Sequence, residues 1–303
     1  MDKVSISTVA KATITSFLER LNVVVPTYER DLQLEQRVAE ITKSWTFRLP
    51  RPSIVTAITL TITAYLHIQD LDTRALITLF TAIATTMDSP EVLNSLAADL
   101  FHGSFAIGSI QQDSGMLGEF ARCLSAAWKC YPRFAASAIM TSSLNFVDAS
   151  IMENTSSDIA VRPGALAFVE HRRIKTGAAE AYAHFIWDKA QFPDVAEYVQ
   201  AIPDANLYVD YVNDILSFYK EELAGETPTY IQDRALACGQ SRLAALHNVI
   251  DDTIAAVERV RTILGEGCAR DAWEGFVAGY IGFHMSCPRY RLSEVTDAKY
   301  IIV

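Results

Sequence analysis

The sequence predicts one all-α domain over residues 1–303, and three observations support this prediction. There are only 13 glycines and 10 prolines in 303 residues, fewer than the roughly 12% combined share of average proteins. Apolar residues recur at helical spacing, and no stretch combines strand-like alternation with a hairpin turn. No repeat or linker divides the chain, and with 50% hydrophobic residues it is long enough to bury a large core.

The expected helices follow one another between prolines. The first, Leu34–Trp45, is amphipathic, with apolar residues every three to four positions and charges between them. The next two, Pro52–Gln69 and Ala75–Met87, are apolar nearly all round. The later ones are Glu119–Lys129, Phe134–Met152, Asp194–Ala201, Ala205–Ala224, Ile231–Leu264 and Arg270–Met285. The breaks between helices fall at Pro90, Pro132, Pro163, Pro193, Pro203, Pro228 and Pro288.

The two apolar runs admit two interpretations. Pro52–Gln69 has no charged residue and is long enough to span a bilayer, but it is rich in threonine and includes His67 and Gln69. Two such runs also describe central helices of a soluble bundle around an apolar cavity. We favour the bundle and expect no stable membrane insertion.

Charge and cysteine content narrow the class of protein. The net charge is −10 and no basic run occurs, which argues against binding nucleic acid. The five cysteines form no CxxC pair, and the N-terminus has no secretory h-region, so reduced thiols and a cytoplasmic location are expected. The cysteines are Cys123, Cys130, Cys238, Cys268 and Cys287.

The sharpest chemical signal is a polar stripe on the expected helix Ala205–Ala224. Asn213, Ser217 and Glu221 step by four residues, so each step turns about 40° beyond a full turn and rises about 6 Å. Amide, hydroxyl and carboxylate oxygens are ligands that suit Mg²⁺. Lys220 returns to nearly the face of Asn213 and can meet an anion held by that metal. Asp214 lies about 100° from Asn213 and is expected to make a structural contact.

A solvated helix face is the alternative interpretation of this stripe, because polar residues at this spacing are routine. The flanking residues argue against it, since a polar stripe on a greasy helix is more typical of a site. These flanking residues are Leu207, Tyr208, Tyr211, Ile215, Leu216 and Phe218.

The segment NDILSFYKE, Asn213 to Glu221, resembles the NSE/DTE metal motif of class I terpene cyclases. With its lysine it is most similar to the trichodiene-synthase branch of fungal sesquiterpene cyclases. His171–Gly177 (HRRIKTG) resembles that branch's diphosphate-sensing arginine segment, and Gly279–Glu294 its C-terminal Arg-Tyr stretch, here Arg289 and Tyr290. Tyr131–Ile151 resembles its central helices. The resemblance implies an all-α bundle around an apolar active-site cavity.

The family's first metal motif, DDxx(D/E) at a helix end, is incomplete here. The equivalent position has Asp88, then Ser89 in place of the second acid, and Glu91 as the distal acid. Pro90 disfavours helix at Ser89, so Asp88 is expected at a helix terminus facing the cavity mouth. We expect Asp88 and Glu91 to be the acids of this motif.

The resemblance implies a linear isoprenoid diphosphate as substrate, with farnesyl diphosphate favoured, and three Mg²⁺ ions. Asp88 and Glu91 would hold one part of the metal cluster, and Asn213, Ser217 and Glu221 another. The diphosphate would be bound, and its departure catalysed, by Arg173, Lys220, Arg289 and Tyr290. Arg291 is expected to pair with Glu294 instead.

The expected function is therefore that of a sesquiterpene cyclase. Aromatic faces stabilise a carbocation, and the candidates are Tyr65, Phe80, Trp187 and Tyr211. Proton loss would give a hydrocarbon and water capture an alcohol. His67, His102 and His284 are not spaced as metal ligands and are expected in the core or behind the site.

Two other classes stay open, together with assembly into a homodimer. A chain-elongating isoprenyl diphosphate synthase would need two Asp-rich motifs, and this chain lacks one complete example. A non-catalytic helical or membrane-associated protein would explain the apolar runs without a metal.

Overall fold

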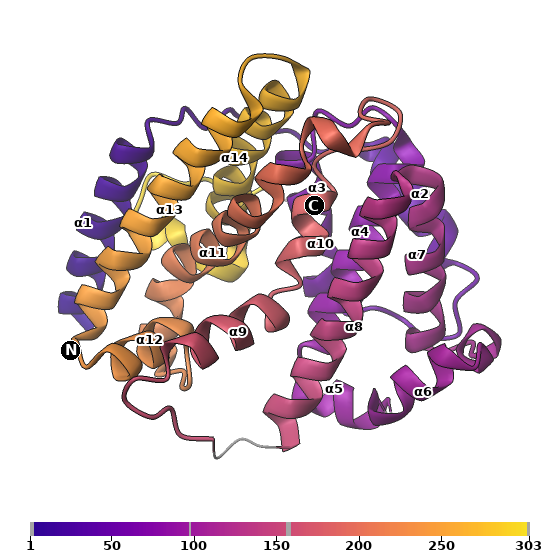
Figure 1. The fold of residues 1–303 in the computed structure, drawn as a ribbon, viewed down its shortest axis with the longest axis horizontal. Helices are drawn as coiled ribbons and strands as arrows, with labels where there is room; N and C mark the ends of the chain where they lie inside the picture. Colours follow the sequence, from indigo (N-terminus) through magenta and orange to yellow (C-terminus); the bar gives the residue numbers. More distant parts are fainter. Residues whose placement is uncertain (1–2, 97, 156–158, 302–303) are drawn as a thin grey trace.

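Helices form the regular structure of residues 3–96, 98–155 and 159–301, which the computed structural model describes (Figure 1). No strand occurs within these ranges, so the all-α prediction is confirmed. The helices are α1 (Lys3–Leu21), α2 (Leu32–Thr42), α3 (Arg51–Ala64), α4 (Leu71–Met87), α5 (Pro90–Ser95), α6 (Phe101–Ala106), α7 (Met116–Cys130), α8 (Arg133–Thr155), α9 (Leu166–Thr176), α10 (Ala179–His184), α11 (Ile202–Ala224), α12 (Tyr230–Cys238), α13 (Arg242–Leu264) and α14 (Cys268–Ser286). Short 3₁₀ turns are Ala98–Leu100, Ser109–Gln112, Val195–Glu197, Val199–Ala201, Pro288–Tyr290 and Leu292–Glu294.

Local sequence signals fix the ends of the helices that reach the site. The Asp70 carboxylate caps α4 by accepting from the Thr73 amide at 2.7 Å, and α4 ends at Met87 with Asp88 as its C-cap. Pro90 then opens α5. Helix α11 ends at Ala224, and its C-cap Gly225 has a φ of 66°, in the left-handed region that favours glycine. The expected position of Asp88 at a helix end is confirmed.

Several expected boundaries are wrong. The predicted helix Ile231–Leu264 is two helices, because Gly239 adopts a left-handed φ of 64° and Ser241 caps α13 through the Ala244 amide. Asp194–Ala201 forms two 3₁₀ turns rather than a helix. The sequence reasoning missed α1 and α9; α9 buries only Val169 outright, so its apolar stripe is thin.

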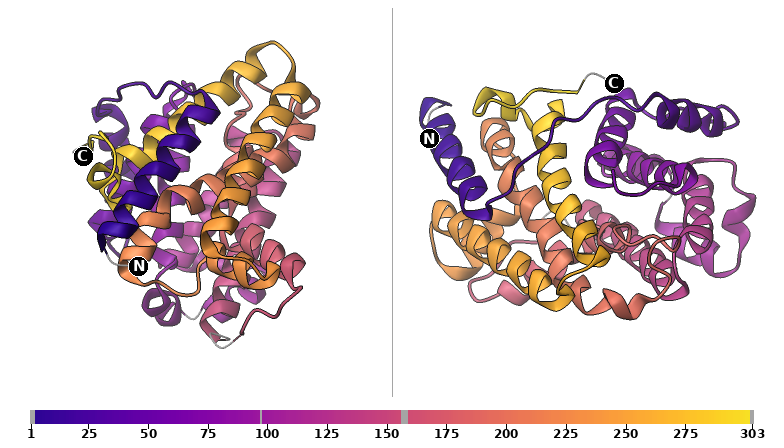
Figure 2. Two further views of the ribbon diagram at one scale, coloured as in Figure 1. Left: turned by 90° about the vertical axis from the view of Figure 1, so that its left-hand side faces the viewer. Right: turned by 90° about the horizontal axis from the view of Figure 1, so that it is seen from above.

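The bundle is built around α3 and α4, which are buried over most of their length. Helix α3 packs against α4 and α14, and α10 contacts both α8 and α11. Helix α13 covers the other side of α11, and Figure 2 shows the long helices running side by side. Gly279 allows the α14–α3 crossing, because a Cβ there would lie 2.2 Å from the Thr63 carbonyl oxygen. Among the described residues, no helix is long and apolar enough to cross a membrane.

Candidate active site

A cavity of about 380 Å³ opens between α3, α4, α8, α10, α11 and α14. Seven of the predicted site residues line it: Asp88, Arg173, Asn213, Lys220, Glu221, Arg289 and Tyr290. Their side chains come from four separate regions of the chain. The other lining residues include Leu60, Ala84, Phe146, Val209, Tyr182, Tyr280 and Phe283. Charged groups and an apolar wall therefore share one cavity, as an isoprenoid diphosphate needs.

A larger cavity of about 750 Å³ lies beside α2, α4 and α7. Its lining mixes apolar residues such as Trp45 and Leu76 with charges of both signs, and it includes none of the predicted site residues. We therefore assign the site to the smaller cavity, where the motifs meet.

Two members of the polar stripe of α11, Asn213 and Glu221, line this cavity, whereas Ser217 is 1% exposed and outside the cavity lining. The Ser217 hydroxyl donates to Glu221 Oε1 at 2.6 Å, and Lys220 Nζ lies 3.3 Å from the same oxygen. Lys220 also lies 3.6 Å from Glu226, which lines the cavity from the loop after α11. A hydroxyl and a carboxylate this close can share one cation, and the ammonium beside them can meet its anion.

The third member of the stripe, Asn213, is held by α14. Burial lowers the pKa of His284 to about 3, so its ring is neutral. His284 Nδ1 lies 2.8 Å from the Tyr280 carbonyl oxygen, which only accepts, so Nδ1 carries the hydrogen and Nε2 is the acceptor. Asn213 Nδ2 lies 3.4 Å from that Nε2 and 3.2 Å from the Tyr290 hydroxyl. The amide nitrogen is thereby committed, and Oδ1 is the atom available for a metal.

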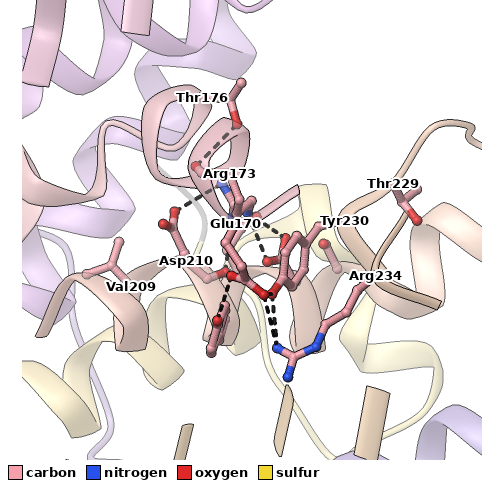
Figure 3. Close-up of polar contacts among 12 residues, drawn as sticks. Glu170, Arg173, Thr176, Val209, Asp210, Thr229, Tyr230 and Arg234 are labelled. Carbon is pink, nitrogen blue, oxygen red and sulfur yellow. Dashed lines mark hydrogen bonds and ion pairs between the residues drawn. The ribbon is translucent and has the colours of Figure 1, made fainter. Parts of the chain in front are cut away.

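Arg173 connects α9 to α11 through two buried acids. Its Nε donates to the Asp214 carboxylate at 2.9 and 3.1 Å, its Nη1 lies 3.0 Å from Asp210 Oδ1, and its Nη2 donates to the Asp210 carbonyl at 3.0 Å. Figure 3 shows the Arg173–Asp210 pair between the two helices. Burial raises the pKa of Asp210 to about 7 and that of Asp214 to about 6, against the opposing charge of Arg173. Asp214 thus makes the structural contact expected of it, and Asp210 is a cavity residue that the sequence reasoning missed.

Gly177 leaves the room that this ion pair needs. A Cβ at this position would lie 2.0 Å from Asp210 Oδ1 and 2.6 Å from Arg173 Nη1. Its φ of −80° is ordinary, so the requirement for glycine is steric alone.

A second polar network ties α9 to α12 (Figure 3). Glu170 accepts from the Tyr211 hydroxyl at 2.9 Å and from the Tyr230 hydroxyl at 2.7 Å, and Arg234 lies 3.6 Å from it. The two tyrosine rings stack with centroids 5.5 Å apart. Tyr211, a predicted cation-stabilising residue, therefore belongs to this network and does not line the cavity.

The other three predicted aromatic residues are buried away from the cavity lining. Tyr65 donates its hydroxyl to the Tyr182 carbonyl at 2.8 Å, and Phe80 packs edge-on against the Tyr182 ring. Trp187 stacks on Tyr198 with ring centroids 4.7 Å apart. The aromatic residues that line the cavity are Phe146, Tyr182, Tyr230, Tyr280, Phe283 and Tyr290.

The first metal motif places one acid at the cavity. Asp88 lines it with 61% of its side chain exposed, and Arg289 Nη2 approaches its carboxylate to 3.7 Å. Glu91 lies on α5, exposed and outside the cavity lining. Glu153 of α8, which the sequence reasoning missed, lines the cavity instead. Arg291 pairs with Glu294 at 2.6 Å, as expected.

The donor set limits how a metal can bind. No group of three or more His, Cys, Asp or Glu residues is placed to hold an ion within the described ranges. A hard cation such as Mg²⁺ can also take amide and hydroxyl oxygens beside a carboxylate. Asn213 Oδ1, Ser217 and Glu221 supply such ligands, so the residues fit Mg²⁺.

A family model described as Trichodiene synthase (TRI5) matches residues 50–300. The chain belongs to the trichodiene synthase family. The family assignment confirms an enzyme of the terpene synthase class and favours it over chain elongation and over a non-catalytic protein.

Named relatives agree with this family. "Monoterpene synthase 25" of Postia placenta is 52% identical over 97% of this chain and 89% of its own length. Longiborneol synthase of Gibberella zeae is 34% identical over 75% of this chain and 68% of its own. Among solved structures, linalool/nerolidol synthase from Streptomyces clavuligerus, in complex with 2-fluorogeranyl diphosphate, is similar with a TM-score of 0.61 and 15% identity. The match covers 86% of this chain and 97% of that one, and it supports the terpene synthase fold.

Proposed function

We propose that the protein ionises farnesyl diphosphate in a magnesium-dependent step and cyclises the cation to a sesquiterpene hydrocarbon or alcohol, releasing diphosphate. The supporting observation is that hard oxygen ligands and three cationic side chains line the same cavity as an apolar, aromatic wall. Geranyl diphosphate is the second candidate substrate, because a relative 52% identical to this chain is named a monoterpene synthase.

We propose three Mg²⁺ ions as the cofactor. Asp88 would hold part of the cluster from α4, and Asn213, Ser217 and Glu221 would hold the other part from α11. Bound Mg²⁺ would neutralise the diphosphate charge and so make it a better leaving group. Glu91 is left outside this ligand set because it is exposed and does not line the cavity. Ser217 does not line the cavity either, but it is kept because its hydroxyl donates to Glu221, which does. Glu153 is an acid of α8 that lines the cavity.

The cationic side chains have different duties in this proposal. Lys220 and Arg289 pair only loosely with carboxylates, at 3.3 to 3.7 Å, so both can turn to a diphosphate. Arg289 can do so bidentately, and the Tyr290 hydroxyl beside Asn213 can donate to the same anion. Arg173 has further N–H groups, besides those that donate to Asp210 and Asp214, and these can donate to the diphosphate. Because Asp210 and Asp214 belong to α11, Arg173 would connect the bound anion to this helix.

The apolar wall then governs the cation. Tyr280 and Phe283 are nearly fully buried at the cavity, and their faces stabilise positive charge by about 0.5–2 kcal/mol each. Excluding water during ionisation strengthens every electrostatic contact with the diphosphate.

The wider setting is also a proposal. We propose that residues 1–303 act as one domain in the cytoplasm, a setting that suits the five unpaired cysteines. A homodimer is the assembly we propose to test, by light scattering after gel filtration.

Product analysis tests the function directly. The protein is incubated with farnesyl or geranyl diphosphate and Mg²⁺, with and without isopentenyl diphosphate, and extracts are separated by gas chromatography. We expect a C15 terpene from farnesyl diphosphate, released diphosphate, and no product with EDTA or in Glu221→Gln. A longer diphosphate would show chain elongation, a product from geranyl diphosphate alone would correct the substrate, and silence in every tube would overturn the proposal.

A further inference from the structure

Helix α9 carries Arg173 into the cavity lining, yet little apolar packing holds this helix in place. Val169 is the one buried residue among those of α9. Asp214 accepts from Arg173 Nε and the Asp210 carbonyl from Nη2, while Nη1 lies 3.0 Å from Asp210 Oδ1. Each terminal nitrogen carries a second N–H that these contacts do not use. Because the guanidinium is a rigid planar fork, the direction of these N–H groups depends on how α9 is oriented.

Glu170, one helical turn before Arg173, holds α9 against two other helices. Its carboxylate accepts from the Tyr211 hydroxyl of α11 at 2.9 Å and from the Tyr230 hydroxyl of α12 at 2.7 Å (Figure 3). Burial raises the pKa of both phenols, so both remain donors. Arg234 Nη1 donates to the Tyr230 oxygen at 3.0 Å, which leaves the Tyr230 proton for Glu170. Hydrogen bonds of defined direction therefore fix this part of α9.

The same carboxylate connects two sides of the cavity without reaching it. Arg173 lines the cavity from α9, and Thr229 and Tyr230 line it from the start of α12. Glu170 lies between these two helices and does not line the cavity. It can therefore act on a bound anion only through its neighbours.

We propose that Glu170 is a positioning residue for the diphosphate: by fixing α9 against α11 and α12, it directs the remaining N–H groups of Arg173 towards the anion. The proposal rests on the proposed function and adds to it a residue that touches neither substrate nor metal. A residue that only stabilised the fold would change the melting temperature and leave the affinity for magnesium diphosphate as it is. The loss of a negative charge would by itself favour an anion. Weaker binding without Glu170 would therefore report orientation and not charge.

Thermal melting at a fixed Mg²⁺ concentration with increasing inorganic diphosphate measures this affinity without turnover. Glu170→Gln keeps the side-chain shape but removes the charge and one of the two acceptor oxygens. The diphosphate concentration that gives half of the shift in melting temperature should rise about tenfold, within the range for residues that act on a site they do not contact.

Asp252→Asn is the matched control, because Asp252 of α13 pairs with Arg234 at 2.5 Å and does not line the cavity. It removes a negative charge from the same network without freeing α9, so the half-shift concentration should stay unchanged. A second comparison uses Arg173→Lys, which keeps the positive charge beside Asp210 and Asp214. A single flexible ammonium has no fork to orient, so adding Glu170→Gln to Arg173→Lys should change the concentration by less than about twofold.

Three results would each refute the positioning role while leaving the proposed function intact. They are a half-shift concentration in Glu170→Gln within about twofold of wild type, an equal rise in Asp252→Asn, and the full effect of Glu170→Gln in the Arg173→Lys background. A wild-type melting temperature that does not respond to Mg²⁺ and diphosphate would instead overturn the proposed site, and this inference with it.

Discussion

Replacing His284 should weaken magnesium binding although this residue is not a proposed ligand. In His284→Phe the ring remains but both nitrogens are lost, so Asn213 Nδ2 keeps only the Tyr290 hydroxyl as partner. The amide can then rotate and present nitrogen where Oδ1 is needed. Side chains that orient a metal ligand are worth 10–100-fold in affinity, and since the Nε2–Nδ2 distance of 3.4 Å is long, we expect about tenfold.

Thermal melting in the presence of Mg²⁺ and inorganic diphosphate measures this without turnover. A ligand at 100 times its Kd stabilises the folded protein by about 2.7 kcal/mol, so binding of Mg²⁺ raises the melting temperature measurably. The Mg²⁺ concentration that gives half of the shift in melting temperature is therefore used to compare affinities. His184→Phe is the control, because His184 is equally buried but does not line the cavity. It should leave the half-shift concentration unchanged.

The double variant His284→Phe/Asn213→Asp separates orientation from packing. A carboxylate presents oxygen either way round, so the substituted side chain needs no partner to orient it, and magnesium binding should recover. Binding within twofold of wild type in His284→Phe alone would refute the orientation argument. Loss that persists in the double variant would mean that the ring supports the site only by packing.

Other changes separate direct contacts from support. Arg289→Lys should slow turnover roughly 10–100-fold, the range for a lost charged hydrogen bond, and Tyr290→Phe less; both should melt near wild type, and a large drop in Tm would make the pair structural. Asp88→Asn should slow diphosphate release at least about tenfold at limiting Mg²⁺ while Glu91→Gln stays close to wild type; the reverse order in steady-state kinetics would show that the first motif is misaligned. Gly177→Ala should cost about 1–3 kcal/mol of unfolding free energy, because its Cβ overlaps the adjacent ion pair, and an unchanged urea midpoint would contradict that steric argument.

The metal stripe could be predicted from the sequence because its geometry is local. Asn213, Ser217 and Glu221 lie on one helix, so their spacing alone places them on one face. The same arithmetic could have found Asp210, which lies about 60° from Asn213, between the angles of Ser217 and Glu221. Asp214 is about 100° from Asn213 but only about 20° from Glu221, which explains why it also lines the cavity. The angle between Asp214 and Asn213 alone does not reveal that Asp214 lies on nearly the same face as Glu221.

The cavity wall could not be predicted in the same way. Whether an aromatic residue lines a cavity or fills the core depends on contacts between helices far apart in the sequence. Phe80 and Tyr182 touch edge-on, yet only Tyr182 reaches the cavity, because α10 lies beside α8 and α11 while Phe80 faces the core of α4 and α7. The break at Gly239 was missed for a different reason: one glycine in an apolar helical pattern ends the helix only when a left-handed φ and a following cap coincide.

Acid should destabilise the protein in part through His184. Neither of its ring nitrogens has a hydrogen-bond partner among the described residues, and burial lowers its pKa to about 4, against about 6.5 for an unfolded chain. The unfolded chain therefore binds the extra proton first, and stability is lost as the pH falls from 6.5 towards 4, by about 2 kcal/mol at pH 5. Asp210 and Asp214 act in the opposite direction, because their raised pKa values let the folded protein take up protons as the pH falls below 7.

Because these contributions oppose each other, the pH dependence of the wild-type unfolding free energy does not isolate His184. The difference in unfolding free energy between a His184 variant and wild type does. The unfolding free energy of His184→Phe relative to wild type, measured with urea, should become more favourable by about 2 kcal/mol between pH 7 and pH 5. His247→Gln, at an exposed position on α13, is the control. If the difference between His184→Phe and wild type is the same at both pH values, His184 does not remain neutral in the folded protein, and its burial contributes nothing to acid sensitivity.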